Sequence, residues 1–363
     1  MAKGAVFKPE KPQSRFMDEK GRLYFYDNAK FILIFLVVLA HAVSPFQTEY
    51  GAIGILWKTI NTFHMPLMIF ISGFFSKRYI GANGSLKVQR AFSYFMLYLF
   101  SQLFVSLFEK LVLHNRSVGF SIVSARSSLW FLMCLGVWYL VLPFFSKFKG
   151  AAVIIAGIII GLIIGYDANV GHDLSLSRVF VHFPFFMAGY FCTPELIGKL
   201  NNTYIRFISI PLFTICVCVI VLLDEYYPGR IITCSNSYEN VMPVVDMQYG
   251  LVWLSRLLFY ALAFVTGASF FAIVPRVKVF FTRFGSRTLA VYILHRFLYL
   301  CWIDKTLAWW KIFDEMEYGL PMVFGIAVAV TVILSLKPFS LPFTAIQKIP
   351  VRCLLKHEEE RAK

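Results

Sequence analysis

The stretch FILIFLVVLA, residues 31–40, decides the fold class of this chain, and it runs directly into a histidine, His41. Asp27 and Lys30 precede it and place its start near one surface of a membrane. Such a continuous apolar run indicates a membrane helix. An imidazole at bilayer depth is costly to leave unpaired, so His41 is a candidate functional residue.

A second apolar segment repeats this combination. It contains TFHMPLM, residues 62–68, followed by SGFF, residues 72–75, so that His64 also falls inside a predicted span. Imidazole gains and loses a proton near neutral pH. Two histidines at membrane depth therefore indicate proton-transfer chemistry.

The composition places the whole chain in the same class. Of its 363 residues 58% are hydrophobic and only 15% are charged, and the mean hydropathy is +0.68. This leaves too little polar surface to cover a soluble globule. The apolar runs are continuous rather than alternating, which favours helices over a barrel. We predict an all-α, polytopic membrane helical bundle of about ten transmembrane helices, over residues 30–46, 53–75, 91–113, 129–145, 151–166, 179–196, 207–223, 251–274, 287–303 and 319–336.

The basic residues predict the orientation of this bundle. Most of the 35 Lys and Arg residues fall in the N-terminal segment, the C-terminal segment and alternate loops, whereas the other loops are richer in acids. Lys and Arg stay on the cytoplasmic side, so both termini are expected there. We predict a cytoplasmic segment 1–29, a membrane domain 30–336 and a cytoplasmic tail 337–363. The net charge of +15 then reflects topology, and no nucleic-acid partner is expected.

Neither cysteine nor histidine spacing indicates a metal site. The seven cysteines form no CxxC pair, and His41 and His64 lie on separate predicted helices without thiols or carboxylates at ligand spacing. Gly157, Gly161 and Gly165 recur every four residues and predict close packing of another helix rather than chemistry.

The two histidine segments resemble the membrane acyltransferase 3 family. Asp27, Lys30 and His41 match its pattern of an acidic residue, a basic residue three positions later and a histidine eleven positions after the base. Residues 63–75 are similar to the second helix of the branch that includes fucose 4-O-acetylases and related polysaccharide O-acetyltransferases. Arginine is common where Lys30 stands, and lysine keeps the charge but loses the bidentate fork.

Later segments extend the resemblance over nearly the whole chain. Lys87 and Arg90 are similar to a basic pair of the family, with Lys87 in place of the more usual arginine. Three further segments match in order: SLWFL at 128–132, HFPFFMAGY at 182–190 and YILH at 292–295.

The resemblance implies an integral membrane O-acyltransferase. Such an enzyme would move an acetyl or another small acyl group from a coenzyme A thioester to a hydroxyl of a cell-envelope or exported carbohydrate. The implied partners are acyl-CoA, the carbohydrate acceptor and membrane lipid, and the implied location is a bacterial inner membrane. No permanently bound cofactor is expected, since acetyl-CoA or another acyl-CoA is the donor substrate.

The residues themselves agree with that chemistry. Acyl transfer to a hydroxyl needs a base, and we predict His41 in this role, with His64, Asp27 and Lys30 as further catalytic residues. Helical rise puts His41 roughly 16 Å from Lys30, His64 about 20 Å from the predicted inner edge and His295 about 12 Å from it. These intermediate depths permit one buried site, reached by a donor from the cytoplasm and an acceptor from outside.

Binding residues are predicted on both sides of that site. Lys87 and Arg90 suit the phosphates of coenzyme A. Arg126, Trp130 and His295 are candidates for the acceptor pocket, because arginine donates to sugar oxygens and indole stacks on a sugar face.

Each assignment has a structural alternative. A histidine can simply bond a neighbouring helix carbonyl, Lys30 can anchor a helix end by snorkelling, and Asp27 can favour the helix N-terminal dipole. Lys87 and Arg90 can serve topology alone, and Trp130 can belong to an interfacial aromatic belt.

A different function class also uses membrane histidines and arginines. A proton-coupled secondary transporter or flippase would do so, but such proteins often contain inverted repeats. The chain shows no convincing internal repeat, so the enzyme is favoured.

Overall fold

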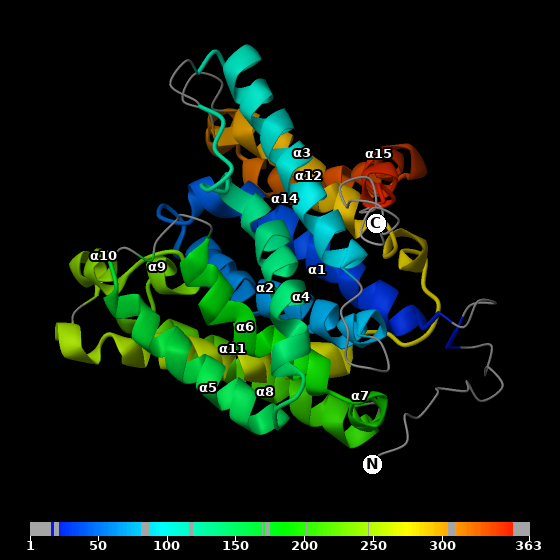
Figure 1. The fold of residues 1–363 in the computed structure, drawn as a ribbon. Coiled ribbons are helices and arrows are strands. Elements are labelled where there is room, and N and C mark those ends of the chain that lie inside the picture. The colour runs from blue at the N-terminus through cyan, green and yellow to red at the C-terminus, as the bar shows by residue number, and fades with distance from the viewer. Residues whose placement is uncertain are drawn as a thin grey trace.

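The computed structural model is an all-helical bundle (Figure 1). It describes residues 16–17, 22–80, 88–115, 119–168, 170, 175–200, 202–245, 247–303 and 309–350. Over these residues the α-helices are α1 Tyr24–Val43, α2 Gly51–Ser76, α3 Gln89–Leu111, α4 Trp130–Phe145, α5 Gly150–Ile163, α6 Leu176–Phe191, α7 Pro194–Lys199, α8 Thr203–Leu222, α9 Gly229–Ile232, α10 Tyr238–Val241, α11 Trp253–Ile273, α12 Thr288–Ile303, α13 Trp310–Asp314, α14 Gly319–Leu334 and α15 Lys337–Gln347.

A helix occupies each of the ten ranges predicted as spans. Within the described residues, four helical segments are long and apolar enough to cross a membrane, namely Tyr24–Phe46, Gln89–Leu111, Thr203–Leu222 and Tyr249–Ile273. A fifth results if α14 and α15, bent by 56° at their junction, count as one span. Shorter apolar helices include α4, α5 and α12. The chain is thus a multi-pass helical membrane protein, and ten crossings remain a prediction.

Helix α1 lies at the centre of the bundle and packs against α2, α12 and α14 (Figure 1). It begins at Tyr24, six residues before the predicted boundary at residue 30. Asp27 therefore lies in the first turn of α1, and both members of the Asp27–Lys30 ion pair are helical residues.

Two glycines let α2 and α6 cross at backbone contact. A methyl group on Gly73 would lie 2.0 Å from the Phe186 carbonyl oxygen, and one on Gly189 would lie 2.0 Å from the Phe70 carbonyl oxygen. Only a residue without Cβ fits at both positions. This crossing fixes α2, which carries His64, against α6.

The glycine stripe of α5 packs as predicted. Gly157 contacts Pro184 of α6, Gly161 lies against Tyr260 of α11, and Gly165 lies against Tyr238. The small residues therefore let α5 lie close to α6 and α11.

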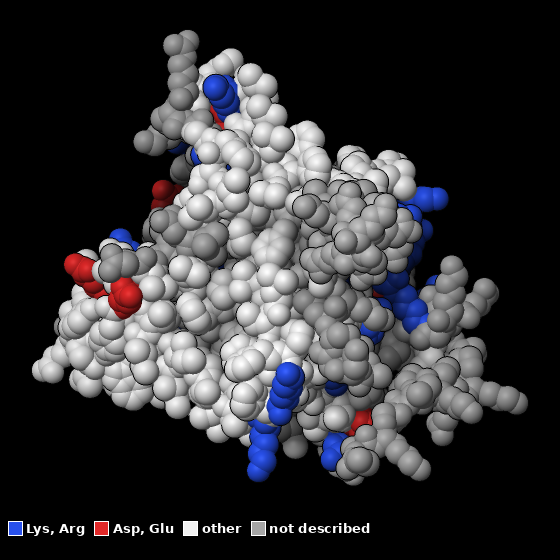
Figure 2. Space-filling model, viewed as in Figure 1, with Lys and Arg blue, Asp and Glu red and all other residues white. Residues whose placement is uncertain are grey.

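Charge is distributed unevenly over the surface. On the face in Figure 2, Lys and Arg gather along the right and lower edges, beside α15, α7 and the start of α1, whereas acidic residues gather at the left, over α10. Basic and acidic residues thus gather at different edges of this face, as the uneven charge of the loops leads us to expect. The sidedness of the termini remains a prediction.

The C-terminal helix α15 is part of the bundle. It packs against α3 and α12, and Ser93 Oγ donates to the Gln347 carbonyl at 2.9 Å. The Gln89 side chain donates to the Ile349 carbonyl at 2.6 Å. The first part of the predicted tail 337–363 is thus a packed helix, and residues 351–363 lie outside the described residues.

Candidate functional site

Three helices bring histidines to one cavity of about 250 Å³. We call it the histidine cavity, defined by His41 of α1, His64 of α2 and His182 of α6. Its wall also contains Asn61, Ser128, Trp130, Arg178, Thr233, Tyr292 and Tyr299. The structure thus unites His41 and His64, which were predicted from separate sequence segments.

Backbone hydrogen bonds orient His64 and His182. The Nδ1 atoms of these rings lie 2.6 Å and 3.2 Å from the carbonyl oxygens of Ile60 and Arg178, each four residues earlier in the same helix. A carbonyl oxygen only accepts, so Nδ1 carries the proton in each case. In the neutral ring Nε2 is then a proton acceptor.

His41 is held differently. Its ring stacks on that of His295, with centroids 5.2 Å apart, and contacts the Tyr299 ring at 4.6 Å. No described residue forms a hydrogen bond with the His41 ring. The simple structural alternative, a histidine tied to a helix carbonyl, therefore fits His64 and not His41.

His295 lies behind His41 rather than in the histidine cavity. Its Nδ1 donates to the Val291 carbonyl at 2.8 Å, and it is buried. Together with His41 and Trp302 it lines a separate small cavity of about 50 Å³. This position suits support of the His41 ring more than direct contact with an acceptor.

Trp130, at the start of α4, forms an aromatic wall of the histidine cavity. The His182 ring lies 5.0 Å from it, and the Arg178 guanidinium lies over the indole at 5.0 Å. Arg178 was not predicted as a site residue from the sequence. Its spacing of four from His182 puts both on one face of α6, which was the available signal.

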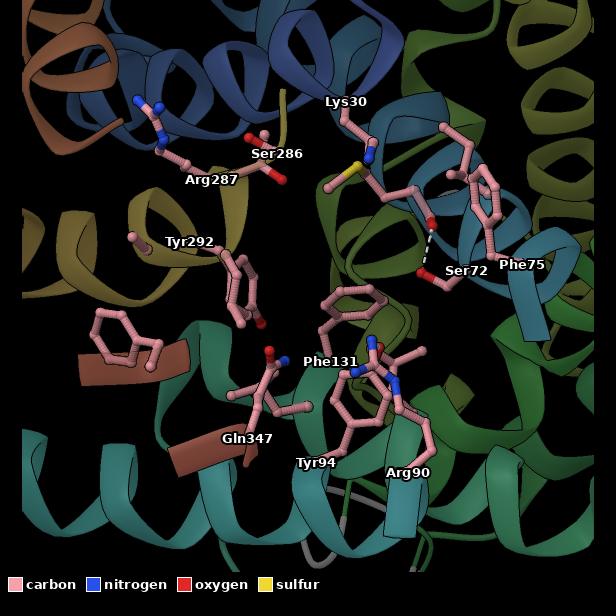
Figure 3. Close-up of a pocket in the computed structure, with 18 of the residues that line it drawn as sticks. Lys30, Ser72, Phe75, Arg90, Tyr94, Phe131, Ser286, Arg287, Tyr292 and Gln347 are labelled. Atoms are coloured by element: carbon pink, nitrogen blue, oxygen red, sulfur yellow. Dashed lines mark hydrogen bonds between the residues drawn. The ribbon is translucent and has the colours of Figure 1, made fainter. Parts of the chain in front are cut away.

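A second cavity, of about 260 Å³, is basic. We call it the basic cavity, defined by Lys30, Arg78, Arg90 and Arg287. Figure 3 shows Lys30 and Arg90 approaching it from opposite sides, from α1 and α3. Ser340, Phe343, Thr344 and Gln347 of α15 also line it, so this helix closes part of its wall.

Aromatic and acidic partners hold the cations of the basic cavity. Lys30 Nζ lies 3.0 Å from Asp27 Oδ1, which also pairs with Arg22 at 2.5 Å. Arg90 donates to the Tyr94 hydroxyl at 2.9 Å and lies over the Tyr79 ring at 5.1 Å. Asp27 thereby holds the Lys30 ammonium in an ion pair.

Tyr292 of α12 lines both cavities. Its ring packs at 5.5 Å on that of Phe131, which lines the basic cavity. Among the described residues Tyr292 is the one common to both linings. The Tyr292 side chain is thus part of the wall of both cavities, and Figure 3 shows it at the basic cavity.

The family model described as the acyltransferase domain, of the acyltransferase 3 family, matches residues 23–337. The chain belongs to the acyltransferase 3 family. It is therefore an acyltransferase enzyme, and the transporter alternative is set aside. The match does not separate the branches of the family. No curated protein and no solved structure shows significant similarity to the chain.

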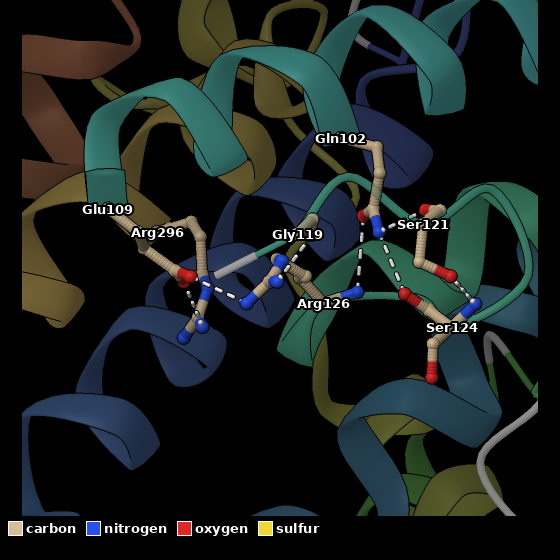
Figure 4. A network of polar contacts seen from close by, with 7 residues as sticks. All are labelled: Gln102, Glu109, Gly119, Ser121, Ser124, Arg126 and Arg296. Carbon is tan, nitrogen blue, oxygen red and sulfur yellow. Dashed lines mark hydrogen bonds and ion pairs between the residues drawn. The ribbon is translucent and has the colours of Figure 1, made fainter. Parts of the chain in front are cut away.

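Of the predicted binding residues Lys87 and Arg126, only Arg126 can be placed in this acyltransferase. Lys87 falls outside the described residues. Arg126 lines neither cavity; its Nη1 lies 2.6 Å from Glu109 Oε2, and its backbone amide donates to Gln102 at 3.1 Å (Figure 4). Arg296 also approaches Glu109, at 3.9 Å. Arg126 is thus engaged in an ion-pair network beside the histidine cavity.

In the part of the chain that the structure describes, no group of three or more His, Cys, Asp or Glu side chains is arranged so that it could hold a metal ion. The chemistry available in the two cavities is that of imidazole bases and of cations.

Proposed function

We propose that this acyltransferase moves an acetyl or another small acyl group from a coenzyme A thioester to a hydroxyl of a cell-envelope or exported carbohydrate, in a bacterial inner membrane. One observation carries the proposal. A cavity rich in cations and a cavity rich in histidines share Tyr292 in their walls. A thioester donor in the first and a hydroxyl acceptor in the second would bring their reacting atoms together there.

The basic cavity suits the donor. Coenzyme A carries several phosphates, and Lys30, Arg78 and Arg90 supply the cationic donors that phosphates bind. The predicted pairing of Lys87 with Arg90 would extend this set at the start of α3. The pantetheine arm would then run past Phe131 toward Tyr292.

The histidine cavity suits the acceptor and the base. In the proposed step, His41 removes the proton from the acceptor hydroxyl, and the hydroxyl oxygen attacks the thioester carbonyl. The tetrahedral intermediate collapses with cleavage of the carbon–sulfur bond. The leaving coenzyme A thiolate then accepts the proton that His41 holds. His64 Nε2 can accept a hydrogen bond from a second hydroxyl, and Trp130 offers an indole face to the sugar ring.

The remaining predicted residues act at a distance in this scheme. Asp27 positions Lys30, and His295 supports the His41 ring. Arg126 would influence the site through Glu109 and Arg296 rather than by contact with the sugar.

Mass spectrometry of surface glycans from a deletion strain tests the proposal. We expect the glycan to remain while losing the mass of one acyl group at the modified residue, and expression of the wild-type chain should restore that mass. A glycan that retains all its acyl groups would contradict the proposal. Loss of the whole glycan from the surface would also contradict the proposal, which expects the glycan to remain.

A further inference from the structure

Arg178 introduces a positive charge into the histidine cavity without an acidic partner. Its Nε donates to the Thr233 carbonyl at 3.0 Å, and its guanidinium lies over the Trp130 ring. No described residue accepts a hydrogen bond from its two terminal nitrogens, and no described carboxylate pairs with it. Since Arg178 lines the cavity, this end of the fork is available to an occupant.

The other buried arginines of this region are engaged. Arg256 donates to the carbonyl oxygens of Gly161 at 3.2 Å and Asn236 at 3.0 Å, and lies over the Tyr238 ring. Arg296 has Glu109 at 3.9 Å and the Tyr299 ring. Among the described residues, Arg256 Nε and Arg296 Nε and Nη1 also lack hydrogen-bond partners, but neither arginine lines the histidine cavity. Arg178 differs from both in presenting its remaining donors to that cavity.

The wall of the histidine cavity adds no negative charge. Its described lining contains three histidines, several hydroxyls and an amide, and neither aspartate nor glutamate. An ionised arginine at membrane depth is costly unless a partner or water satisfies it. A cavity built in this way favours an anionic occupant over a neutral one.

We propose that Arg178 binds an anionic group of the acceptor, so that the acyltransferase acts on an acidic sugar or a sugar phosphate rather than on a neutral sugar. The fork of an arginine matches the paired oxygens of a carboxylate or a phosphate. The Trp130 ring packs on the flat face of the Arg178 guanidinium. The edge of the guanidinium that carries the two terminal nitrogens is left for the ligand. This inference rests on the proposed function only in naming the occupant as the acceptor.

A binding experiment on the wild-type enzyme tests the inference without any acyl transfer. Calorimetry in neutral-lipid nanodiscs would compare methyl β-D-glucuronide, which carries a carboxylate, with methyl β-D-glucoside, which differs by that group. Glucose 1-phosphate supplies the phosphate arm. We expect at least one anionic probe to bind about ten- to a hundredfold more tightly than the neutral glycoside, because charged hydrogen bonds contribute that much. The tighter anion distinguishes a carboxylate source from a phosphate source.

Variants assign the preference to Arg178. Arg178→Gln should abolish the preference for the anion, and Arg178→Lys should keep part of it. Arg230→Gln is the matched control, since Arg230 donates to the Asn240 carbonyl and does not line the cavity. Equal binding of anionic and neutral probes by the wild type, no binding of either anion, or a preference that survives Arg178→Gln in folded protein would overturn the inference. Because no acyl donor is present, failure here is distinct from failure of the acyl-transfer proposal.

Discussion

His41 combines access to the histidine cavity with a ring that no described hydrogen bond engages. A general base needs a free nitrogen within reach of the acceptor, and stacking on His295 orients the ring without consuming one. His64 and His182 each spend Nδ1 on the helix backbone. Hydrogen-bond partners therefore distinguish His41, the proposed base, from the supporting histidines His64 and His182.

Replacing His41 by alanine should therefore abolish acyl transfer. We expect a loss of about 10²- to 10⁴-fold, the usual contribution of a general base, with near-normal expression and folding. The measurement is acyl transfer per folded protein. His114→Asn is a matched control, because His114 is exposed with φ of 51° and asparagine tolerates that conformation. Wild-type activity in His41→Ala would remove His41 from the role of base.

Substitutions at Lys30 separate a role in the site from a helix anchor. Lys30→Arg should retain much of the activity, because it keeps a cation beside Asp27 and at the wall of the basic cavity. Lys30→Gln should lose most of it, although glutamine still forms hydrogen bonds. The rates are compared per folded protein at neutral pH. Near-wild-type rates for both variants would show that Lys30 only anchors α1.

The sequence predicts some site residues better than others for a physical reason. Asp27, Lys30 and His41 share one helix, so their spacing along the chain sets their spacing in space. Tyr292 enters the site through the packing of α12, which no local spacing encodes. The spacing of Arg178 from His182 gives only their shared face of α6, and the packing of α6 places that face at the cavity. Arg126 was predicted to bind the sugar because arginine often donates to sugar oxygens. The structure instead places it in an ion pair with Glu109, which the sequence did not indicate.

Among the helices, the crossing of α2 and α6 has little tolerance for change. Gly73→Ala or Gly189→Ala would force a methyl group to within 2.0 Å of a backbone oxygen. We expect each to lower stability by about 1–3 kcal/mol or more, the usual cost of overpacking. Thermal unfolding in detergent measures this. Gly325→Ala in α14 is the control, because nothing lies within 4 Å of its added methyl group and alanine favours the helix. An unchanged midpoint for Gly73→Ala would contradict the close crossing.

Apolar patterning located the helices but not their partners. Each predicted span contains a helix, and the glycine stripe at Gly157 and Gly161 does face other helices. The Gly73–Gly189 crossing was not foreseen, because neither glycine belongs to a repeat of small residues at four-residue spacing. The helical packing of α15 was also missed, since its polar flanks and its prolines, Pro338 and Pro342, are typical of a tail.

The whole molecule is predicted to have one orientation in the membrane. A cysteine at Ser85 should resist an impermeant thiol reagent added outside intact cells, whereas a cysteine at Asn236 should react, since basic loops stay in the cytoplasm. Both are introduced after the native cysteines have been replaced, because Cys218 is itself exposed. Labelling of the Ser85 site but not of the Asn236 site would reverse the orientation.

The central claim, that the two cavities work together in acyl transfer, is tested most directly with purified enzyme in nanodiscs. Acetyl-CoA is supplied with deacylated glycan from the deletion strain, and free thiol and glycan-bound acetyl are measured together. We predict that the wild type releases coenzyme A in step with acetyl gained by the glycan, and that Tyr292→Ala, in the wall of both cavities, uncouples the two. The absence of both thiol release and acetylated glycan with folded wild-type enzyme would contradict the account.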